Sequence, residues 1–278
     1  MTTTRKAWIA AAAALAAAAL GPAARADTDY AIADGAAEIG ISVDPDETML
    51  WLNTFPVDPA GAYIDTIRTA YGRVGGPSTL NGLAVRILLY EDANGGSPQD
   101  AVLKWSFTTT IANANTNTLN VYRVPEVKIE GTLVVAVSFD NSLGTTPKGV
   151  AAFDTTAPTL AARSYLGFAG GSVDASSLTI FPASQWGTIE SFGQNGNFRI
   201  EAHGRAAVDD AAVSLTVGQS SPPGLVSLSW AGAQAAYDVW RASRPDFSDG
   251  RLIAAATPAT SLDDNVLGDG RAWFYRVR

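Results

Sequence analysis

The sequence predicts an all-β fold made of two consecutive antiparallel β-sandwiches. Short segments alternate between apolar and polar residues, as strands with one buried face do, and clusters of Gly, Pro, Asn, Asp and Ser separate them. Beyond the first 26 residues, no segment keeps a helical period over three turns. Short strands divided by turns at this spacing are typical of antiparallel sandwiches.

The N-terminus has the pattern of a secretory signal peptide. Arg5 and Lys6 precede the apolar run AWIAAAAALAAAAL, which is followed by the small-residue motif ARA at 24–26. The run is shorter than the roughly 20 apolar residues that a membrane-spanning helix needs. We therefore expect cleavage before Asp27 and no membrane span. The mature protein is expected to be secreted, in the extracellular space or at the cell surface, with the periplasm as the alternative.

The mature chain is acidic and contains no cysteine. Removing the leader takes away three cations, which changes the formal net charge from -8 to -11 and leaves 252 of the 278 residues. An acidic protein repels phosphate backbones, so nucleic acid is not expected as a partner. The lack of cysteine excludes disulfides, thiol catalysis and thiolate metal sites, and the single His203 excludes most transition-metal sites and most catalytic triads.

Five strands are expected in the first unit. Residues 131–139 are apolar on both faces, which predicts a central strand buried on both sides. In 197–204, alternation places Phe198, Ile200 and Ala202 inward and the charged or polar residues between them outward. The five expected strands are 83–90, 101–108, 119–124, 131–139 and 197–204.

A hinge of small and polar residues near residue 208 predicts a domain boundary. The chain then divides into a signal peptide at 1–26, a first sandwich at 27–207 and a smaller second sandwich at 208–278. The strands expected in the second sandwich are 213–217, 225–230, 236–242, 251–257 and 272–278.

The second unit resembles a fibronectin type III-like module. The residues that carry the resemblance are LVSLSW ending at Trp230, YDVWRA with Tyr237 and Val239, and WFYRVR with Tyr275 and Val277. In that family the strand-B tryptophan and the tyrosine of the penultimate strand pack in the core. The sequence ends where the family's last strand would begin, so the strand at 272–278 is expected to be an edge to which another strand can be added.

The first unit resembles a jelly-roll-like domain of bacterial exported proteins whose role is unassigned. The segments that carry this resemblance are DGAAEIG (34–40), WLNTF (51–55), YIDTIRTAYG (63–72), VRILLYEDANGGSPQDAVL (85–103), the apolar strand at 132–139 and GNFRIEA (196–202). The resemblance implies a location outside the membrane rather than an activity. Related domains in secreted enzymes are ancillary modules that hold sugars or partners.

No enzyme motif is present in the sequence. It contains no G-x-S-x-G elbow, no H-E-x-x-H, no P-loop and no G-x-G-x-x-G turn before a helix. Acidic residues are numerous, but none forms a pair marked by its local context, so surface acids are the simpler interpretation. We expect no catalytic residues.

Tryptophan is the residue type that would carry a binding role. Flat aromatic rings suit the faces of sugars, but Trp105 and Trp230 fall in the apolar phase of strands, where core packing is expected. Trp186 lies in the loop-like stretch FPASQWGTIES, and Trp240 lies in the phase opposite Val239. Trp186 and Trp240 are therefore the candidate binding residues, both expected to be exposed.

The loop EDANGGSPQD is the one candidate metal site. Asp92, Asn94 and Asp100 offer oxygen ligands. The spacing Asp92-x-Asn94-x-Gly96 resembles the first half of an EF-hand loop and Asp100 falls at its ninth position, yet the twelfth position, which needs a bidentate Glu, holds Leu103. The sequence is therefore not an EF-hand. Two interpretations stay open: an irregular calcium site, and a hairpin turn that Asp, Asn and Gly satisfy without an ion. The turn is the simpler, so no cofactor is expected.

The function that follows is a non-catalytic, secreted or cell-surface β-sandwich protein with a binding, adhesion or structural role. Its expected partner is an extracellular glycan or protein. Two alternatives stay open. One is an ancillary carbohydrate-binding component or fragment of a secreted glycoside hydrolase, and the other is a subunit of an extracellular assembly that self-associates by strand addition at the C-terminal edge.

Overall fold

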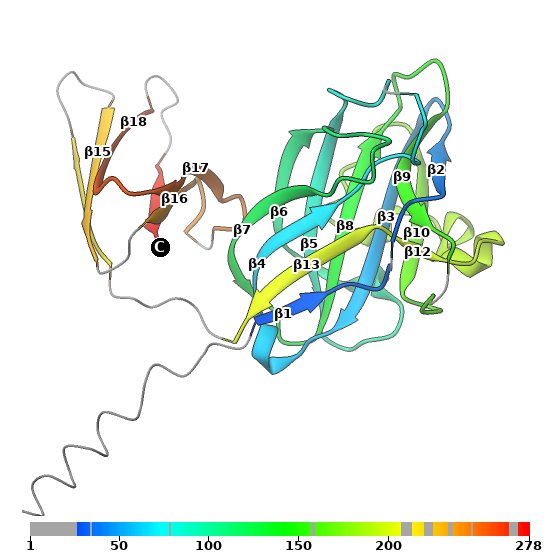
Figure 1. Ribbon diagram of the computed structural model, residues 1–278, viewed down its shortest axis with the longest axis horizontal. Helices are drawn as coiled ribbons and strands as arrows, with labels where there is room; N and C mark the ends of the chain where they lie inside the picture. The colour runs from blue at the N-terminus through cyan, green and yellow to red at the C-terminus, as the bar shows by residue number, and fades with distance from the viewer. Residues whose placement is uncertain are drawn as a thin grey trace, which may run out of the picture.

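The computed structural model describes residues 27–33, 35–77, 79–156, 159–206, 213–219, 225–232, 236–245, 247–266 and 272–278. These residues form strands joined by turns and five short 3-10 helices, and every strand pairing is antiparallel (Figure 1). The all-β prediction is therefore confirmed. The predicted signal peptide and the predicted boundary near residue 208 lie outside the described residues.

The first unit is a sandwich of one large sheet against two smaller ones. The large sheet has the order β11-β10-β3-β8-β5-β6, and the smaller sheets have the orders β1-β13-β4-β7 and β12-β9-β2. The strands are β1 (Asp27–Tyr30), β2 (Ile39–Val43), β3 (Glu47–Pro56), β4 (Tyr63–Thr69), β5 (Ala84–Asp92), β6 (Val102–Thr110), β7 (Asn120–Lys128), β8 (Thr132–Asp140), β9 (Lys148–Asp154), β10 (Ser164–Gly170), β11 (Trp186–Thr188), β12 (Asn197–Phe198) and β13 (Ile200–Arg205).

Alternation along the strands divides their side chains between two apolar cores. On β3, Met49 and Trp51 enter the main core between the sheets, and Leu50 and Leu52 enter a second core on the outer face of the large sheet. The segment that contains η3 (Leu178–Ile180), η4 (Ala183–Gln185) and η5 (Ile189–Phe192) covers that outer face. β8 lies between β3 and β5. Its Val135 and Val137 enter the main core and its Val134 and Ala136 enter the second core, so both of its faces are buried, as the apolar run at 131–139 predicts.

The second unit contains two three-stranded sheets, with the orders β14-β15-β18 and β17-β16-β19. Its core includes Trp230, which the sequence pattern placed inside, together with Tyr237, Val239 and Val277, and Tyr275 packs against it partly buried. The strands are β14 (Ser214–Gln219), β15 (Leu225–Ala231), β16 (Tyr237–Ala242), β17 (Arg251–Thr257), β18 (Ser261–Asn265) and β19 (Phe274–Val277). The polar sequence SLDDN of β18 was not expected to form a strand.

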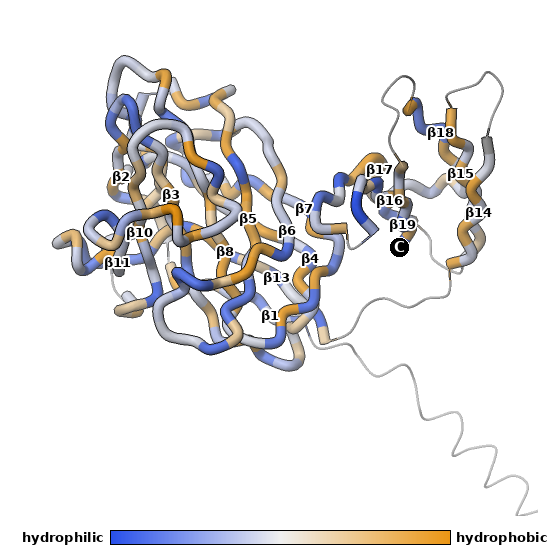
Figure 2. The backbone as a smooth tube through the Cα atoms, turned by 180° about the vertical axis from the view of Figure 1, so that it is seen from behind, coloured by the Kyte–Doolittle hydropathy of each residue, from blue (hydrophilic) through white to orange (hydrophobic). Residues whose placement is uncertain are grey.

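The second unit packs against the edge of the large sheet at β6 (Figure 2). The Trp105 Nε1–H donates to the carbonyl of Gly250 at 3.0 Å, and the Ser106 N–H donates to the carbonyl of Ser248 at 3.3 Å. The Arg276 guanidinium donates to the carbonyl of Pro125 at 2.9 Å. The 247–250 turn therefore supplies a hydrogen-bond acceptor to the outer edge of β6, whose backbone groups would otherwise face solvent.

A fragment that ends at residue 206 is expected to keep a cooperative thermal transition, because the first unit has its own continuous core. Its melting temperature should fall by several degrees, since Trp105 and the outer edge of β6 lose their cover. A thermal melt followed by circular dichroism, with iodide quenching of tryptophan fluorescence, measures both effects. Loss of a cooperative transition would show that the two units share one folding core.

Candidate functional site

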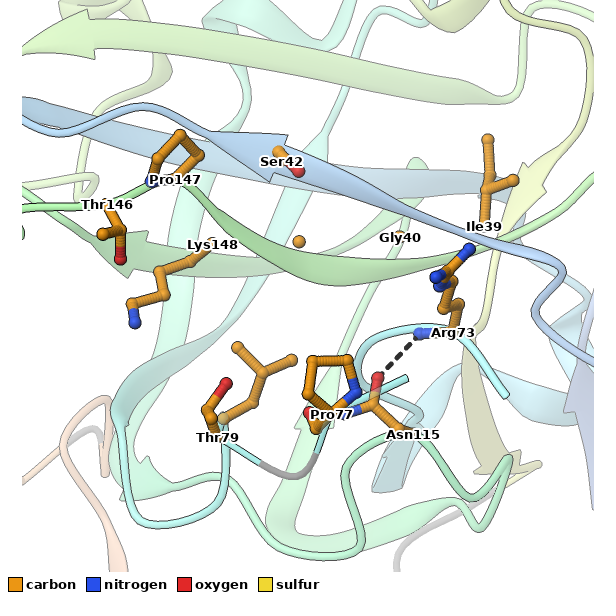
Figure 3. Close-up of a pocket in the computed structure, with 12 residues that line it drawn as sticks. Ile39, Gly40, Ser42, Arg73, Pro77, Thr79, Asn115, Thr146, Pro147 and Lys148 are labelled. Atoms are coloured by element: carbon orange, nitrogen blue, oxygen red, sulfur yellow. Dashed lines mark hydrogen bonds between the residues drawn. The ribbon is translucent and has the colours of Figure 1, made fainter. Parts of the chain in front are cut away.

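A groove of about 610 Å³ opens beside β2 and β9 in the first unit (Figure 3). Two turns border it, one after β4 and one before β9. We call it the Arg73 groove; its lining residues are Ile39, Gly40, Ser42, Arg73, Pro77, Thr79, Leu80, Asn115, Thr146, Pro147, Lys148 and Gly149.

Glycine shapes the floor of the Arg73 groove. A Cβ atom on Gly40 would lie 2.8 Å from the carbonyl oxygen of Gly149, so no larger residue fits there without separating β2 from β9. The register of this strand pair shifts between Ile41 and Ser42. Such irregularities re-aim side chains beside functional surfaces, and here the result is a stretch of bare backbone facing the groove.

Asn115 fixes the wall that carries Arg73. Its Oδ1 accepts from the Arg73 N–H at 3.0 Å, and its Nδ2 donates to the carbonyl of Pro77 at 2.6 Å. A Cβ atom on Gly72, where φ is +70°, would lie 2.1 Å from the Asn115 Oδ1. The loop therefore depends on glycine at 72 and on the amide at 115.

The charges in the Arg73 groove are all of one sign. Arg73 and Lys148 lie at its two ends, and none of its described lining residues is acidic (Figure 3). Neither cation forms an ion pair within the described part of the chain. Hydroxyl groups of Ser42, Thr79 and Thr146 also line the groove. This arrangement can hold a polar, negatively charged molecule, and it contains no nucleophile paired with a base.

The two candidate tryptophans are buried, so the expectation that they face solvent is wrong. Trp186 is 9% exposed and stacks with Tyr165 and Phe181 at centroid distances of 6.0 and 5.9 Å. Trp240 is 3% exposed and packs with Leu252 where the two units meet. Trp186 was expected outside because it lies in a loop-like stretch, and Trp240 because of its strand phase; neither pattern shows that tertiary packing covers the ring.

The loop after β5 has the geometry of a turn. The Asp92 Oδ1 accepts from the N–H groups of Asn94 and Gly95 at 3.1 and 2.9 Å, and the Asn94 Nδ2 donates to the Asp100 Oδ2 at 2.7 Å. Gly95 and Gly96 take positive φ values, which the reversal requires. These contacts join β5 to β6 in a hairpin, which supports the turn interpretation.

Calcium is expected to leave the melting temperature of the full chain unchanged beyond the effect of matched ionic strength. A bound ion at about 100 times its Kd would add about 2.7 kcal/mol, which is easily detected. Asp92→Ala should cost about 1 kcal/mol because two part-buried N–H groups lose their acceptor, whereas Asp92→Asn keeps that acceptor. A chelator effect reversed by calcium and not by magnesium would instead make Asp92, Asn94 and Asp100 ion ligands.

Two carboxylates with cation partners, Asp65 and Glu126, line a smaller cavity of about 210 Å³ between the two units. Asp65 lies 2.9 Å from the His203 Nδ1 and 2.6 Å from the Arg205 Nε, and Glu126 forms an ion pair with Arg278. Burial lowers the pKa of Arg278 to about 10, so the guanidinium stays charged at neutral pH. Each carboxylate is thus matched by a cation in an arrangement that joins the two units.

Comparison with known proteins gives no family. No family model matches the chain, and no curated protein matches it. Among solved structures, the chain is similar to the structure of a clostridial cysteine protease, Cwp84, after propeptide cleavage. The identity is 11% and the TM-score 0.43, and the match covers 66% of this chain and 41% of that one.

A second solved structure contains the cysteine protease and lectin-like domains of Cwp84, a surface layer associated protein of Clostridium difficile. It shows 13% identity and a TM-score of 0.41, and the match covers 66% of this chain and 36% of that one. The chain thus spans less than half the length of these two proteins. At such TM-scores the likeness carries no argument about this chain. Within the described residues, no helix has the length and apolar character needed to cross a membrane.

Proposed function

We propose that this protein is an exported, non-catalytic β-sandwich protein that binds an extracellular glycan in the Arg73 groove. The observation that carries the proposal is the groove itself, a polar cavity of about 610 Å³ floored by glycine backbone. Ligand pockets in proteins measure about 300–1,000 Å³. Hydroxyl, amide and cationic side chains around an open floor suit a polyhydroxylated ring.

The fold supports a binding role in a modular, exported protein. A jelly-roll-like first domain agrees with a sandwich of large and small sheets, and a fibronectin type III-like second domain agrees with two three-stranded sheets around Trp230 and Tyr237. The leader at 1–26 supports export to the cell surface, the extracellular space or the periplasm. Fold alone assigns no ligand, so the groove is the basis of the proposal.

The absence of catalysis is part of the proposal. A glycosidase needs one carboxyl that stays protonated and a second that is free to act at the sugar. In the cavity between the units, Asp65 contacts His203 and Arg205, and Glu126 contacts Arg278. Both carboxylates are thus engaged in ion pairs within the protein, so the pair suits structure better than acid–base chemistry.

Affinity electrophoresis of the full chain through gels that contain dextran, xylan, polygalacturonate, alginate or heparin tests the proposal. We expect retardation by at least one polymer and no release of reducing ends. Thr79→Trp fills the groove from an exposed position and should abolish the retardation. Retardation that is unchanged in Thr79→Trp, or no retardation by any polymer, would contradict glycan binding in the groove.

Self-association by strand addition is a second candidate, and the position of β19 favours it. β19 ends the sheet order β17-β16-β19, and β16 is its one partner among the described strands. We expect sedimentation velocity to show dimers whose fraction rises with protein concentration. Amide exchange across 274–277 should then slow as dimers form. A monomer at every concentration, with slow exchange throughout, would exclude this candidate.

A further inference from the structure

We infer that the ligand of the Arg73 groove is an acidic glycan, one that carries carboxylate or sulfate groups at two positions along its chain. This inference rests on the proposed function and adds the ligand's chemical class. It follows from the pairing of charges in the molecule, from the places of Arg73 and Lys148 in the groove, and from the groove's floor.

About half of the cations in the described residues are matched by acids. Described ion pairs join Arg68 to Asp29, Arg86 to Asp174, Lys104 to Glu91, Lys128 to Glu130, Arg199 to Glu201, Arg205 to Asp65, Arg241 to Asp264 and Arg278 to Glu126. Arg73 and Lys148 are among the described cations that form no such pair, with Arg123, Arg163, Arg244, Arg251 and Arg276, and they are the two that line this groove. Two unmatched cations that line one groove make a local positive site on a negative molecule, which concentrates anions there.

The positions of the two cations select for spaced charges. Arg73 and Lys148 project from opposite ends of the groove (Figure 3). A small monoanion would therefore engage one of them, whereas a chain with repeated charges engages both. Arg73 suits the bidentate geometry of carboxylate or sulfate, and Lys148 supplies a point charge. Asn115 acts as a positioning residue, because it holds the Arg73 backbone through its Oδ1.

The floor and walls favour sugar rings. Gly40 and Gly149 leave a surface without side chains, on which a ring can lie. Around the groove, Ser42, Thr79 and Thr146 offer hydroxyl groups that both donate and accept, as sugar hydroxyls do.

Titration calorimetry of the full chain tests the inference with three matched probes: a galacturonate oligomer, a sulfated heparin oligomer and a neutral galactose oligomer of the same length. We expect at least one acidic probe to bind at least about tenfold more tightly than the neutral one, with an affinity that falls as salt rises. The double variant Arg73→Gln/Lys148→Gln should remove this preference. The single variant Arg73→Lys keeps a positive charge and should retain part of the preference. The control Arg244→Gln/Arg251→Gln removes the same charge from exposed positions outside the groove and should change nothing.

The outcomes separate the two proposals. If Thr79→Trp abolishes binding but the neutral probe binds as tightly as the acidic ones, and Arg73→Gln/Lys148→Gln binds normally, the groove is the site and the acidic ligand is wrong. If Thr79→Trp has no effect on an acidic probe that binds, the proposed site itself fails. Preference for the galacturonate or the heparin oligomer identifies carboxylate or sulfate as the recognised group, and either result supports the inference.

Discussion

Replacing Asn53 with leucine is expected to lower the free energy of unfolding by about 3–5 kcal/mol, because buried groups would lose their partners. Asn53 is fully buried in β3. Its Nδ2 donates to the carbonyls of Phe198 and Ile200 at 2.8 and 3.1 Å, and its Oδ1 accepts from the Ser164 hydroxyl at 2.7 Å. The amide thus bonds the large sheet to the strands that face it. Urea denaturation followed by circular dichroism measures the loss.

The network around Asn53 supplies the control. The Ser164 Oγ also accepts a hydrogen bond from the Asn197 Nδ2 at 3.0 Å, so Ser164→Ala should be destabilising as well. The double variant Asn53→Leu/Ser164→Ala should cost less than the sum of the single changes, since both remove the same contact. An Asn53→Leu variant within about 1 kcal/mol of the wild type would show that this amide does not bond the sheets together.

Trp105→Ala is expected to cost about 3–5 kcal/mol, the range for loss of a buried indole. Trp105 is 1% exposed within the main core, and its Nε1–H bonds to Gly250 of the second unit. The change should also free the second unit, so trypsin should cut between the units faster. Urea titration and timed proteolysis measure the two effects.

Val102→Ala is the matched control, because Val102 lies on the same strand and is 64% exposed. It should change stability by less than about 0.5 kcal/mol. Trp105→Phe keeps an aromatic ring but loses the donor to Gly250, so it should accelerate proteolysis with a smaller loss of stability. Equal stability of Trp105→Ala and Val102→Ala would contradict the assignment of Trp105 to the core.

Strand phase predicted the main core well. Residues such as Trp105, Phe198, Ile200 and Ala202 are buried as the alternation requires. Strand phase failed where the outward face of a strand is also covered by another part of the protein. Arg199 and Glu201 lie on the outward phase, yet they are 8% and 9% exposed, with charged atoms 3.7 Å apart. Local sequence cannot show which outer faces a later segment will cover, and Trp186 and Trp240 were misplaced for the same reason.

The Arg73 groove could not be predicted from the sequence. GGPSTLNG and NSLGTTPKG read correctly as turn clusters, but they are far apart in the chain. They reach one groove because the segment after β4 bridges to β9 at Tyr71 and Ala151, and the Gly72 N–H donates to the carbonyl of Val150. Neither turn carries a motif, and a single Arg or Lys in a loop is ordinary. The candidate calcium loop, in contrast, does carry a recognisable pattern. That pattern could not decide between a turn and an ion site, because Asp, Asn and Gly at short spacing serve both.

Amide chemical-shift mapping of the full chain, titrated with a galacturonate oligomer and with a heparin oligomer, tests the central claim most directly. We predict that the largest changes fall on residues 39–42, 73–77, 79–80 and 146–149, and that they vanish in Thr79→Trp. Largest changes around Trp186 or between the two units, or no changes at saturating oligomer, would contradict the claim that the Arg73 groove is the ligand site.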